Sequence, residues 1–593
     1  MKFWIMIQKI DRRWVYIALA IMLIFSLNSS FVEKPSKTGA QAQQLYDEIE
    51  NLPKDKLVFI SVTFSSSTLP ENGNQMRAVI RHLALKKQPY AIISFEQQGA
   101  TNASAIGKDV ATQYNLEYGK DYIDMGYNIR TLAFIFSFLD DINKTIKVDA
   151  INKKPIKDYP IMKNIKGLKD NNIGMLIEFT ASASLGDWIQ FVQPKTNPPL
   201  KIGYACTNVM SSDGFPLLDS KQICGMLIGL KGASDYENLV NVKEATVTDL
   251  RYDPRSKITD IEQTISASAL KLMTTQSNAH LIIIILILIG NIGYFVTRKQ
   301  KPVLPEYIPP VEEDESTQKR KQQLTNLFIS ISALVILSAS VALSREGLIN
   351  DMEKMLGVLA TLAVFSIVFR DNATYRFVEH IFVGLATGYG IVITWTQFII
   401  PKWYTSMMPA QMYPNGEGQW WLAMALVCGL MFYTVYFTKL AWINRLAIGI
   451  LMGWSAGTVF KGFAGLMGPQ LIAAFRPPVT SYAPANLSII QQSSDVMTKY
   501  SAIPLGGGFY FYPLETIAFI VLITVMSYFF FTINHKHEWI KKPANMGKYF
   551  MMITLGVIFG NTVMSRFSLL IGRLEFIRLS FQEWIVMLQH WIK

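Results

Sequence analysis

Residues 281–296 read LIIIILILIGNIGYFV, and Arg298, Lys299 and Lys301 follow directly. An apolar run of this length without a single charge is typical of a helix that crosses a lipid bilayer. The basic residues that follow indicate a cytoplasmic end, because Lys and Arg are enriched in cytoplasmic loops. We therefore predict a membrane span at residues 281–297 that returns the chain to the cytoplasm.

An earlier apolar run, at residues 14–27, follows a stretch with four basic residues. Its length lies between the apolar core of a signal peptide and a full membrane helix. We interpret residues 1–31 as a cytoplasmic amino terminus with a first, uncleaved span. Residues 32–280 then lie outside the cytoplasm.

The carboxyl-terminal half is predicted to be a membrane bundle. Residues 298–323 read as a Pro-rich, charged cytoplasmic linker, and residues 324–570 as seven further spans. Each candidate is close to the roughly 20 residues that a helix needs to cross the hydrocarbon layer. The seven candidates are 324–344, 353–369, 377–400, 418–438, 446–466, 508–531 and 549–570.

The distribution of basic residues supports this topology. Eighteen Lys and Arg fall in the proposed cytoplasmic segments and only five in the short outer loops. This asymmetry favours nine spans, with the amino terminus in the cytoplasm and the carboxyl terminus outside. The last residues, 571–593, are amphipathic and are expected to lie in the membrane interface or against a partner subunit. If they cross the bilayer, the count is ten.

Composition and charge agree with an integral membrane protein. Of the 593 residues, 50% are apolar and 17% are charged, whereas soluble proteins carry about 25% charge. The net charge of +12 would suggest a nucleic-acid partner if it lay on one soluble face. Residues 31–280, however, hold 28 basic and 27 acidic residues. The excess therefore flanks the spans, and we expect a lipid bilayer and no nucleic acid as partner.

Residues 32–280 alternate between short β-rich runs and helical runs. Such alternation predicts a parallel sheet with right-handed crossovers, so we expect a Rossmann-like or flavodoxin-like α/β domain. The expected strands are 56–65, 90–95, 174–180 and 201–206. The expected helices are 75–87, 103–114, 129–142 and 188–192.

Hydroxyl and amide side chains follow these strands. In a parallel sheet the loops at the carboxyl ends of the strands meet ligands, so these residues are candidates for binding a small polar ligand. The alternative is that they only cap the helices that follow, as Ser184 with Asp187 would do in a capping box. The candidate ligand residues are Ser66, Ser67, Thr68, Glu96, Gln97, Thr180, Ser182, Thr207 and Asn208.

Two sets of glycines have the four-residue spacing that lets helices approach closely. Gly225 and Gly229 are expected to pack a helix against another subunit or within the domain, and Gly449, Gly453 and Gly457 to pack a membrane helix. The second set overlaps the sequence GWSAG, which matches the nucleophile motif of hydrolases. That motif needs a turn between a strand and a helix, so we favour helix packing over catalysis by Ser455.

Cys206 and Cys224 both lie in the predicted outer domain. They could form a disulfide in an oxidising compartment or remain as buried thiols.

Other catalytic and metal-binding motifs are absent from the sequence. It contains no phosphate-binding P-loop, no HExxH, no paired CxxC and no GxGxxG after the first strand. We therefore predict no catalytic residues, no cofactor and no metal site.

Three short segments carry a resemblance to known proteins. The segment IDRRW at residues 10–14, and LLDSKQ at 217–222 with GLKGASDYE at 229–237, resemble a broad set of bacterial multi-pass membrane proteins with an extracytoplasmic α/β domain. The likeness covers about half of the chain. It implies an inner-membrane, envelope setting and no assigned activity.

The functional expectation is a non-enzymatic membrane component of a bacterial envelope assembly. Its outer domain would bind a partner or a small ligand, and its helical bundle would anchor the chain and form homo- or hetero-oligomers. A transporter or channel with a fused binding domain is the alternative, and an intramembrane or membrane-anchored enzyme is the third hypothesis. Fold alone does not decide among them.

Overall fold

The structure is a computed structural model that describes residues 12–28, 38–246, 268–297, 348–368, 371–409, 418–475, 478–480, 503–530 and 538–592. The chain divides into two compact units. One comprises Met1–Phe31, Thr274–Ala423 and Leu570–Lys593, and the other comprises Val32–Met273 and Met424–Leu569.

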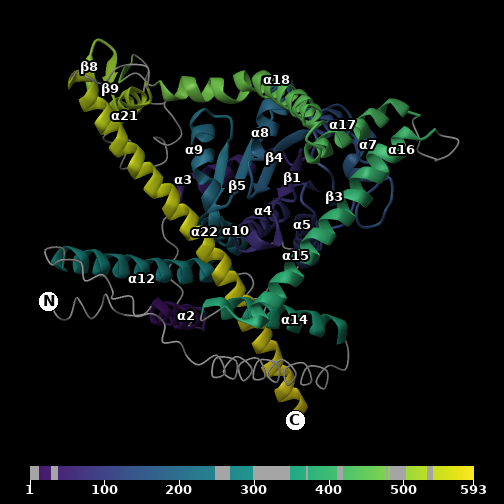
Figure 1. The fold of residues 1–593 in the computed structure, drawn as a ribbon, viewed down its shortest axis with the longest axis horizontal. Helices are drawn as coiled ribbons and strands as arrows, with labels where there is room; N and C mark the ends of the chain where they lie inside the picture. Colours follow the sequence, from purple (N-terminus) through teal and green to yellow (C-terminus); the bar gives the residue numbers. More distant parts are fainter. Residues whose placement is uncertain are drawn as a thin grey trace. The chain divides into compact units, whose positions relative to one another are not determined.

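A six-stranded parallel sheet lies at the centre of the α/β domain, in the order β3-β2-β1-β4-β5-β6 (Figure 1). This is the strand order of the Rossmann fold and differs from that of flavodoxin. The predicted parallel α/β domain is thereby confirmed. The strands are β1 (Leu57–Thr63), β2 (Tyr90–Ser94), β3 (Tyr122–Tyr127), β4 (Ile173–Thr180), β5 (Lys201–Cys206) and β6 (Gly225–Ile228).

Helices cover both faces of the sheet, and each face has its own apolar core. Side chains alternate between the faces along a strand, so Phe59 packs in one core while Val58 and Ile60 pack in the other. One face carries α3 (Ala40–Glu50), α4 (Asn74–Lys86), α5 (Gln97–Gln113) and α10 (Gly229–Thr246). The other carries α6 (Leu132–Asp140), η5 (Trp188–Val192) and α9 (Ser211–Asp219).

Gly225 and Gly229 do not lie on one packing helix, and of the two contacts expected at these glycines the one within the domain is seen at Gly225. Gly225 lies in strand β6, and Gly229 begins α10 with a φ of 52°, which favours glycine. A Cβ on Gly225 would lie only 2.5 Å from the backbone nitrogen of Leu45 in α3. The small residue is needed because a helix packs directly on the end of the sheet.

Outside the α/β domain, most of the residues that the structure describes form apolar helices. By length and composition, four helices within the described ranges could cross a membrane: Ala269–Val296, Ala373–Met407, Ala441–Phe460 and Lys541–Ile585. Shorter apolar helices lie at Trp14–Asn28, Lys354–Val368, Trp420–Tyr436 and Glu515–Phe529. The α-helices in these ranges are α2 (Arg12–Asn28), α12 (Ser268–Thr297), α14 (Leu348–Phe365), α15 (Ala373–Ile393), α16 (Thr405–Met407), α17 (Ala423–Tyr433), α18 (Ala441–Ala474), α21 (Pro513–Phe529) and α22 (Glu538–Ile592). A π-helix, η9 (Thr394–Tyr404), joins α15 to α16, and the short 3₁₀-helices η8 (Ser366–Val368), η10 (Trp420–Leu422) and η11 (Thr434–Tyr436) flank α14 and α17.

Several predicted boundaries can be compared with these helices. The linker 298–323 and the candidate span 324–344 lie outside the described residues. The amphipathic residues 571–592 continue the same helix, α22, that contains the candidate span 549–570.

A small antiparallel sheet precedes α21, in the order β7-β9-β8. Its strands are β7 (Val479–Thr480), β8 (Ile503–Gly506) and β9 (Phe509–Phe511).

The second glycine set lies within one helix. Gly449, Gly453 and Gly457 are all in α18, and a Cβ on any of them would meet nothing within 4 Å. Ser455 is also inside this helix, so it is not at the strand-to-helix turn that a hydrolase nucleophile requires. The glycines therefore form a small-residue stripe on an open part of the helix surface.

Candidate functional site

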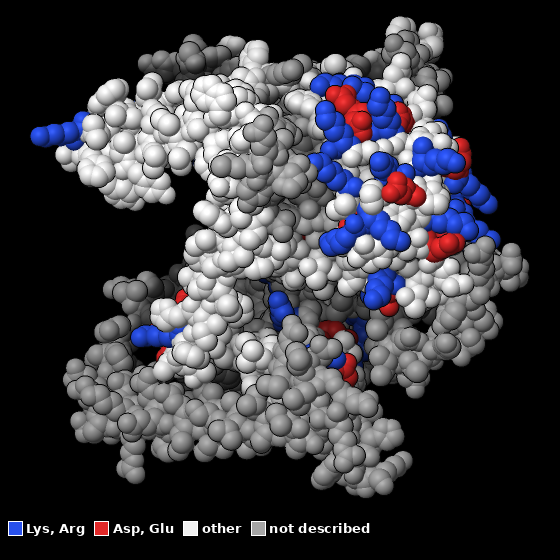
Figure 2. Space-filling view, turned by 90° about the vertical axis from the view of Figure 1, so that its right-hand side faces the viewer, with Lys and Arg blue, Asp and Glu red and all other residues white. Residues whose placement is uncertain are grey.

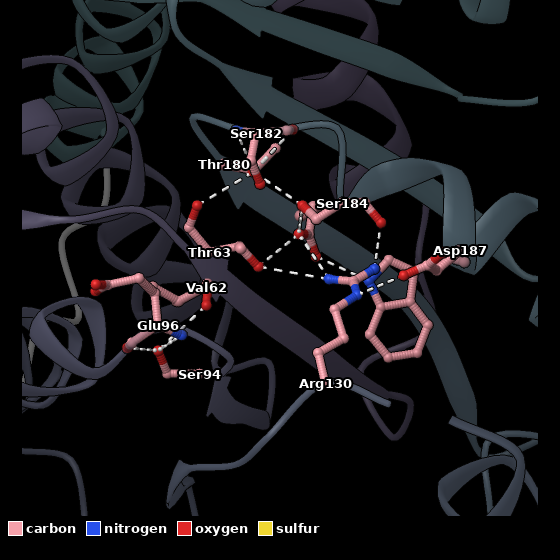
Figure 3. A network of polar contacts seen from close by, with 11 residues as sticks. Val62, Thr63, Ser94, Glu96, Arg130, Thr180, Ser182, Ser184 and Asp187 are labelled. Atoms are coloured by element: carbon pink, nitrogen blue, oxygen red, sulfur yellow. Dashed lines mark hydrogen bonds and ion pairs between the residues drawn. The ribbon is translucent and has the colours of Figure 1, made fainter. Parts of the chain in front are cut away.

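The strand order reverses between β1 and β4, which are neighbours in the sheet but far apart in the sequence. In Rossmann-type sheets, ligands bind outside the carboxyl ends of the strands at this point. A network of polar side chains lies there, drawn from β1, β4 and the loops after β2, β3 and β4 (Figure 3). This carboxyl edge is the candidate functional site.

Glu178 is the centre of the network. It lies inside β4 and is fully buried, yet its carboxylate accepts four hydrogen bonds. Oε1 accepts from the Thr63 hydroxyl at 2.9 Å, the Ser184 hydroxyl at 2.5 Å and Nη1 of Arg130 at 3.3 Å, and Oε2 accepts from Nε1 of Trp188 at 2.8 Å. A buried carboxylate is tolerated only when it is paired and hydrogen-bonded in this way.

Arg130 ties the network together from the loop after β3. Its Nε donates to the carboxylate of Asp187 at 2.9 Å, and its Nη2 donates to the backbone oxygen of Ser184. The guanidinium also lies 5.1 Å from the ring centroids of both Phe95 and Trp188. Aromatic faces attract such a cation, so the side chain is held in one position by packing as well as by charge.

The loop after β4 is fixed by hydroxyl groups. Ser184 Oγ lies 2.8 Å from Thr180 Oγ1, and the Thr180 hydroxyl donates to the backbone oxygen of Thr63 at 3.2 Å. Thr180 Oγ1 accepts from the backbone nitrogen of Ser182 at 2.9 Å. The predicted capping box at Ser184 is wrong, because its side chain caps no helix and bonds to Glu178 and Thr180 instead.

The loops after β1 and β2 meet beside this network. Ser66, Ser67 and Thr68 form the short 3₁₀-helix η1 (Ser66–Thr68), and Glu96 caps α5 by accepting from the backbone nitrogen of Gly99 at 2.7 Å. The backbone nitrogen of Ser66 donates to Gln98, and its hydroxyl accepts from Asn102 at 3.0 Å. Gln97 is the first residue of α5. Ser67 is exposed, so this part of the edge is open to a ligand.

The remaining predicted residues lie at the ends of β5 and β6 and are largely buried. Thr207 precedes the short helix η7 (Asn208–Met210), and the backbone nitrogen of Asn208 donates to Glu71 at 3.0 Å. Burial raises the pKa of the Glu71 carboxyl, and that N–H partly offsets the rise. Gln75 donates to the backbone oxygens of Cys206 and Gly229 at 3.0 and 2.9 Å. Glu71, from the loop after β1, and Gln75, from the first turn of α4, therefore close this part of the edge.

The two cysteines of the domain do not form a disulfide. Both thiols are free. The backbone nitrogen of Cys224 donates to the backbone oxygen of Ile202, so Cys224 lies beside Ile202, which is four residues before Cys206 on β5. At about 3.3 Å per residue, the two Cα atoms are separated by about 13 Å, about twice the distance that a disulfide spans. Burial raises the pKa of Cys224 to about 12, so this thiol stays protonated.

The opposite edge of the sheet contains a cavity of about 600 Å³, beside the amino ends of β2 and β3. The helices α3, α4 and α5 end there, and the buried ammonium group of Lys86 donates to the backbone oxygens of Ile49 and Leu52. Cations are favourable at the carboxyl ends of helices. Lys86 therefore completes the end of α3, whereas Lys243 pairs with Glu50 and Lys120 with Glu117. Five lysines line the cavity. They are Lys54, Lys86, Lys87, Lys120 and Lys243.

Among the side chains that the structure describes, no three His, Cys, Asp or Glu lie close enough together to hold a metal ion.

No family model matches the chain, and no curated protein or solved structure matches it either. The resemblance to bacterial multi-pass membrane proteins therefore remains an expectation from the sequence.

Proposed function

We propose that the chain is an integral component of a bacterial inner-membrane, envelope assembly, with the α/β domain outside the cytoplasm as its binding module. The observation that carries this proposal is the position of the domain in the chain. The apolar helix α2 precedes it and the 30-residue apolar helix α12 follows it. At about 1.5 Å per residue, α12 extends about 45 Å, enough to cross a hydrocarbon layer of about 30 Å.

The topology that we propose has nine spans and a cytoplasmic amino terminus. The positive-inside distribution of Lys and Arg supports it. Four of the helices are long and apolar enough to cross a membrane by themselves.

The carboxyl edge of the sheet supports binding as the role of the domain. At the switch point, the buried carboxylate of Glu178 and the partly buried guanidinium of Arg130 are bonded to each other and to their neighbours. Both charges are engaged in holding the loops in place. The exposed loop around Ser67 then offers hydroxyl groups on a rigid base. We propose that this loop contacts a partner subunit or a small polar ligand and that the chain performs no catalysis itself.

The topology can be tested with single cysteines and a reagent that does not cross membranes. In a Cys428→Ser background, Lys201→Cys in the α/β domain should react in intact cells. Lys439→Cys, in a proposed cytoplasmic loop, should react only after the cells are permeabilised. Both lysines are exposed. The opposite labelling pattern would contradict the proposed orientation.

The assembly can be tested by size-exclusion chromatography in mild detergent, where we expect a species of high mass. Ser67→Trp should reduce this species, because the indole would obstruct the proposed contact loop. Thr112→Trp is the matched control, since Thr112 is also exposed but lies near the other end of α5. A monodisperse monomer before any substitution would count against an assembly role.

A further inference from the structure

The near-neutral charge of the α/β domain conceals a strongly basic segment. Residues 141–170 contain eight lysines and four aspartates, whereas the rest of residues 31–280 contains 20 basic and 23 acidic residues. The thirty residues therefore carry a net charge of +4 on a domain that is otherwise acidic. We call residues 141–170 the lysine segment.

The lysine segment covers the β3 edge of the sheet. Its residues Val148 and Pro155 form an antiparallel bridge. The backbone nitrogen of Ala150 donates to the backbone oxygen of Asp124 in β3 at 2.8 Å, and that of Ile161 donates to the oxygen of Gly119 at 3.1 Å. Backbone hydrogen bonds thus hold the segment against the sheet and fix the place on the surface from which its side chains project.

Three of the four aspartates are directed at backbone groups of the segment itself. The buried carboxylate of Asp149 accepts from the backbone nitrogens of Ile151, Asn152 and Lys154 at 3.0, 2.6 and 2.6 Å. Asp141 accepts from the nitrogen of Lys144, and Asp170 from that of Gly167, both at 3.0 Å. These carboxylates are therefore engaged locally instead of pairing with the lysine ammonium groups.

All eight lysines of the segment are exposed. Of these eight lysines, only Lys169 forms an ion pair with a residue that the structure describes, and its partner is Asp140. The side of the domain with β3 and α7 (Ile142–Thr145) faces the viewer in Figure 2, where Lys and Arg side chains lie interspersed with Asp and Glu side chains. The eight are Lys144, Lys147, Lys153, Lys154, Lys157, Lys163, Lys166 and Lys169.

Two large apolar side chains are exposed among these lysines. Val148 is 45% exposed and Ile151 is 44% exposed, and both belong to the short hairpin that ends at Pro155. Lysines on an edge strand commonly prevent sheets from pairing edge to edge. That role does not account for two exposed apolar side chains between Lys147 and Lys153. Basic and apolar groups side by side are what a surface that contacts lipid headgroups requires.

We propose that the lysine segment docks the α/β domain on the anionic lipid headgroups of the membrane that anchors the chain. The ammonium groups contact the headgroup phosphates, while Val148 and Ile151 enter the boundary between headgroups and acyl chains. This proposal rests on the proposed membrane anchoring, which places the domain within reach of a bilayer.

The test uses the full chain in nanodiscs of pure phosphatidylcholine or of phosphatidylcholine with 30% phosphatidylglycerol. The lysines are labelled briefly with an amine-reactive reagent and quantified by mass spectrometry. In the anionic nanodiscs we expect Lys147, Lys153 and Lys154 to react about threefold more slowly than in the phosphatidylcholine nanodiscs, because each basic side chain gains affinity for a charged surface. High salt should remove the protection, since it screens exposed charges.

Three lysines outside the segment serve as internal controls, because Lys54, Lys108 and Lys221 are also exposed. Their labelling should not change with lipid composition. The variant Lys147→Glu/Lys153→Glu should lose the protection of Lys154, whereas Lys108→Glu/Lys221→Glu should retain it. Equal labelling in the two lipid compositions would overturn the docking proposal and leave the anchoring intact. A chain that does not enter nanodiscs would overturn the anchoring itself.

Discussion

The α/β domain and the apolar helices contain the same kinds of large apolar side chains, but the structure places them in opposite environments. Trp188 and Phe59 of the domain are completely buried between the sheet and its helices. Trp420 and Phe460 of the apolar helices are 77% and 83% exposed. The domain therefore supplies its own apolar surroundings, whereas the helices require a lipid or protein environment that the chain alone does not provide.

Glycine shows the same difference. Gly225 lies against the backbone of α3, where no side chain fits, and it serves the internal packing of the domain. Gly453 meets nothing within 4 Å and is available to a neighbour outside the helix. One spacing pattern in the sequence thus corresponds to two structural roles.

The largest expected loss of stability comes from removing the buried carboxylate of Glu178. Glu178→Ala should destabilise the domain by about 3–5 kcal/mol, because it leaves Arg130 without its buried partner. The melting temperature of the purified chain in detergent measures the loss. Asp187→Ala is the control and should cost less, because the Asp187 side chain is 39% exposed. Equal effects of the two substitutions would contradict a central role for Glu178.

Alanine at Gly225 should have a smaller effect on stability, and alanine at Gly453 should have none. Gly225→Ala should destabilise the domain by about 1–3 kcal/mol, because the new methyl group overlaps the backbone of Leu45. Gly453→Ala should leave the melting temperature of the domain unchanged. If the stripe in α18 contacts another subunit, the second substitution will instead change the mass of the detergent-solubilised species. Thermal melting and size-exclusion chromatography on both variants distinguish the two roles.

Acid should loosen the attachment of α3 to the domain. Glu50 accepts from Nε2 of the buried His82 at 2.8 Å, and Nδ1 of the neutral ring lies 2.7 Å from the Tyr236 hydroxyl, which donates to it. The hydrogen bond from His82 and the ion pair with Lys243 lower the pKa of Glu50 from 4.5 to about 2. Burial lowers the pKa of His82.

Both shifts have the same sign. Each folded-state pKa is below its unfolded value, so each contribution is present at neutral pH and is lost as the pH falls. The loss should begin below about pH 6.5 with His82 and continue between about pH 4.5 and 2 with Glu50. The melting temperature against pH measures it. His82→Gln should flatten the upper part of this profile, and an unchanged profile would argue against the His82 contribution.

The smallest expected effect is that of a reducing agent. Because Cys206 and Cys224 are free thiols on distant parts of neighbouring strands, dithiothreitol should not change the melting temperature of the domain. Mass spectrometry after alkylation should find both cysteines modified once the chain is unfolded without reductant. A decrease in melting temperature with dithiothreitol would indicate a disulfide that this fold does not contain.

The sequence predicted four strands of the sheet but not β3 and β6. The confirmed strands are continuous β-branched and aromatic runs that are buried on both faces. By contrast, β3 contains Asp124 and Gly126, and it lies near the edge that the lysine segment covers. The last strand, β6, has only four residues and is followed by Gly229, so its spacing resembled a helix-packing motif. Short edge strands lack the pattern on which such predictions depend.

The sequence indicated where the candidate site lies but not which charged side chains form it. The loops at the carboxyl ends of the strands do lie together, as expected for a parallel sheet. Arg130 and Glu178 are 48 residues apart, and nothing in their local sequence indicates that they meet. One signal was present, because a glutamate inside the apolar run GMLIEFT is rare unless a partner is buried with it.

Both ends of the α/β domain leave the sheet at the same side, because α3 packs on β6 and α10 begins directly after it. A force applied through the segments before α3 and after α10 should therefore detach these two helices first and separate the central strands last. The Glu50–His82 contact would act as a weak link that yields first. In a single-molecule pulling experiment on the tethered chain, release of α3 should appear as a separate low-force step. A single step in which the whole sheet opens would contradict this order.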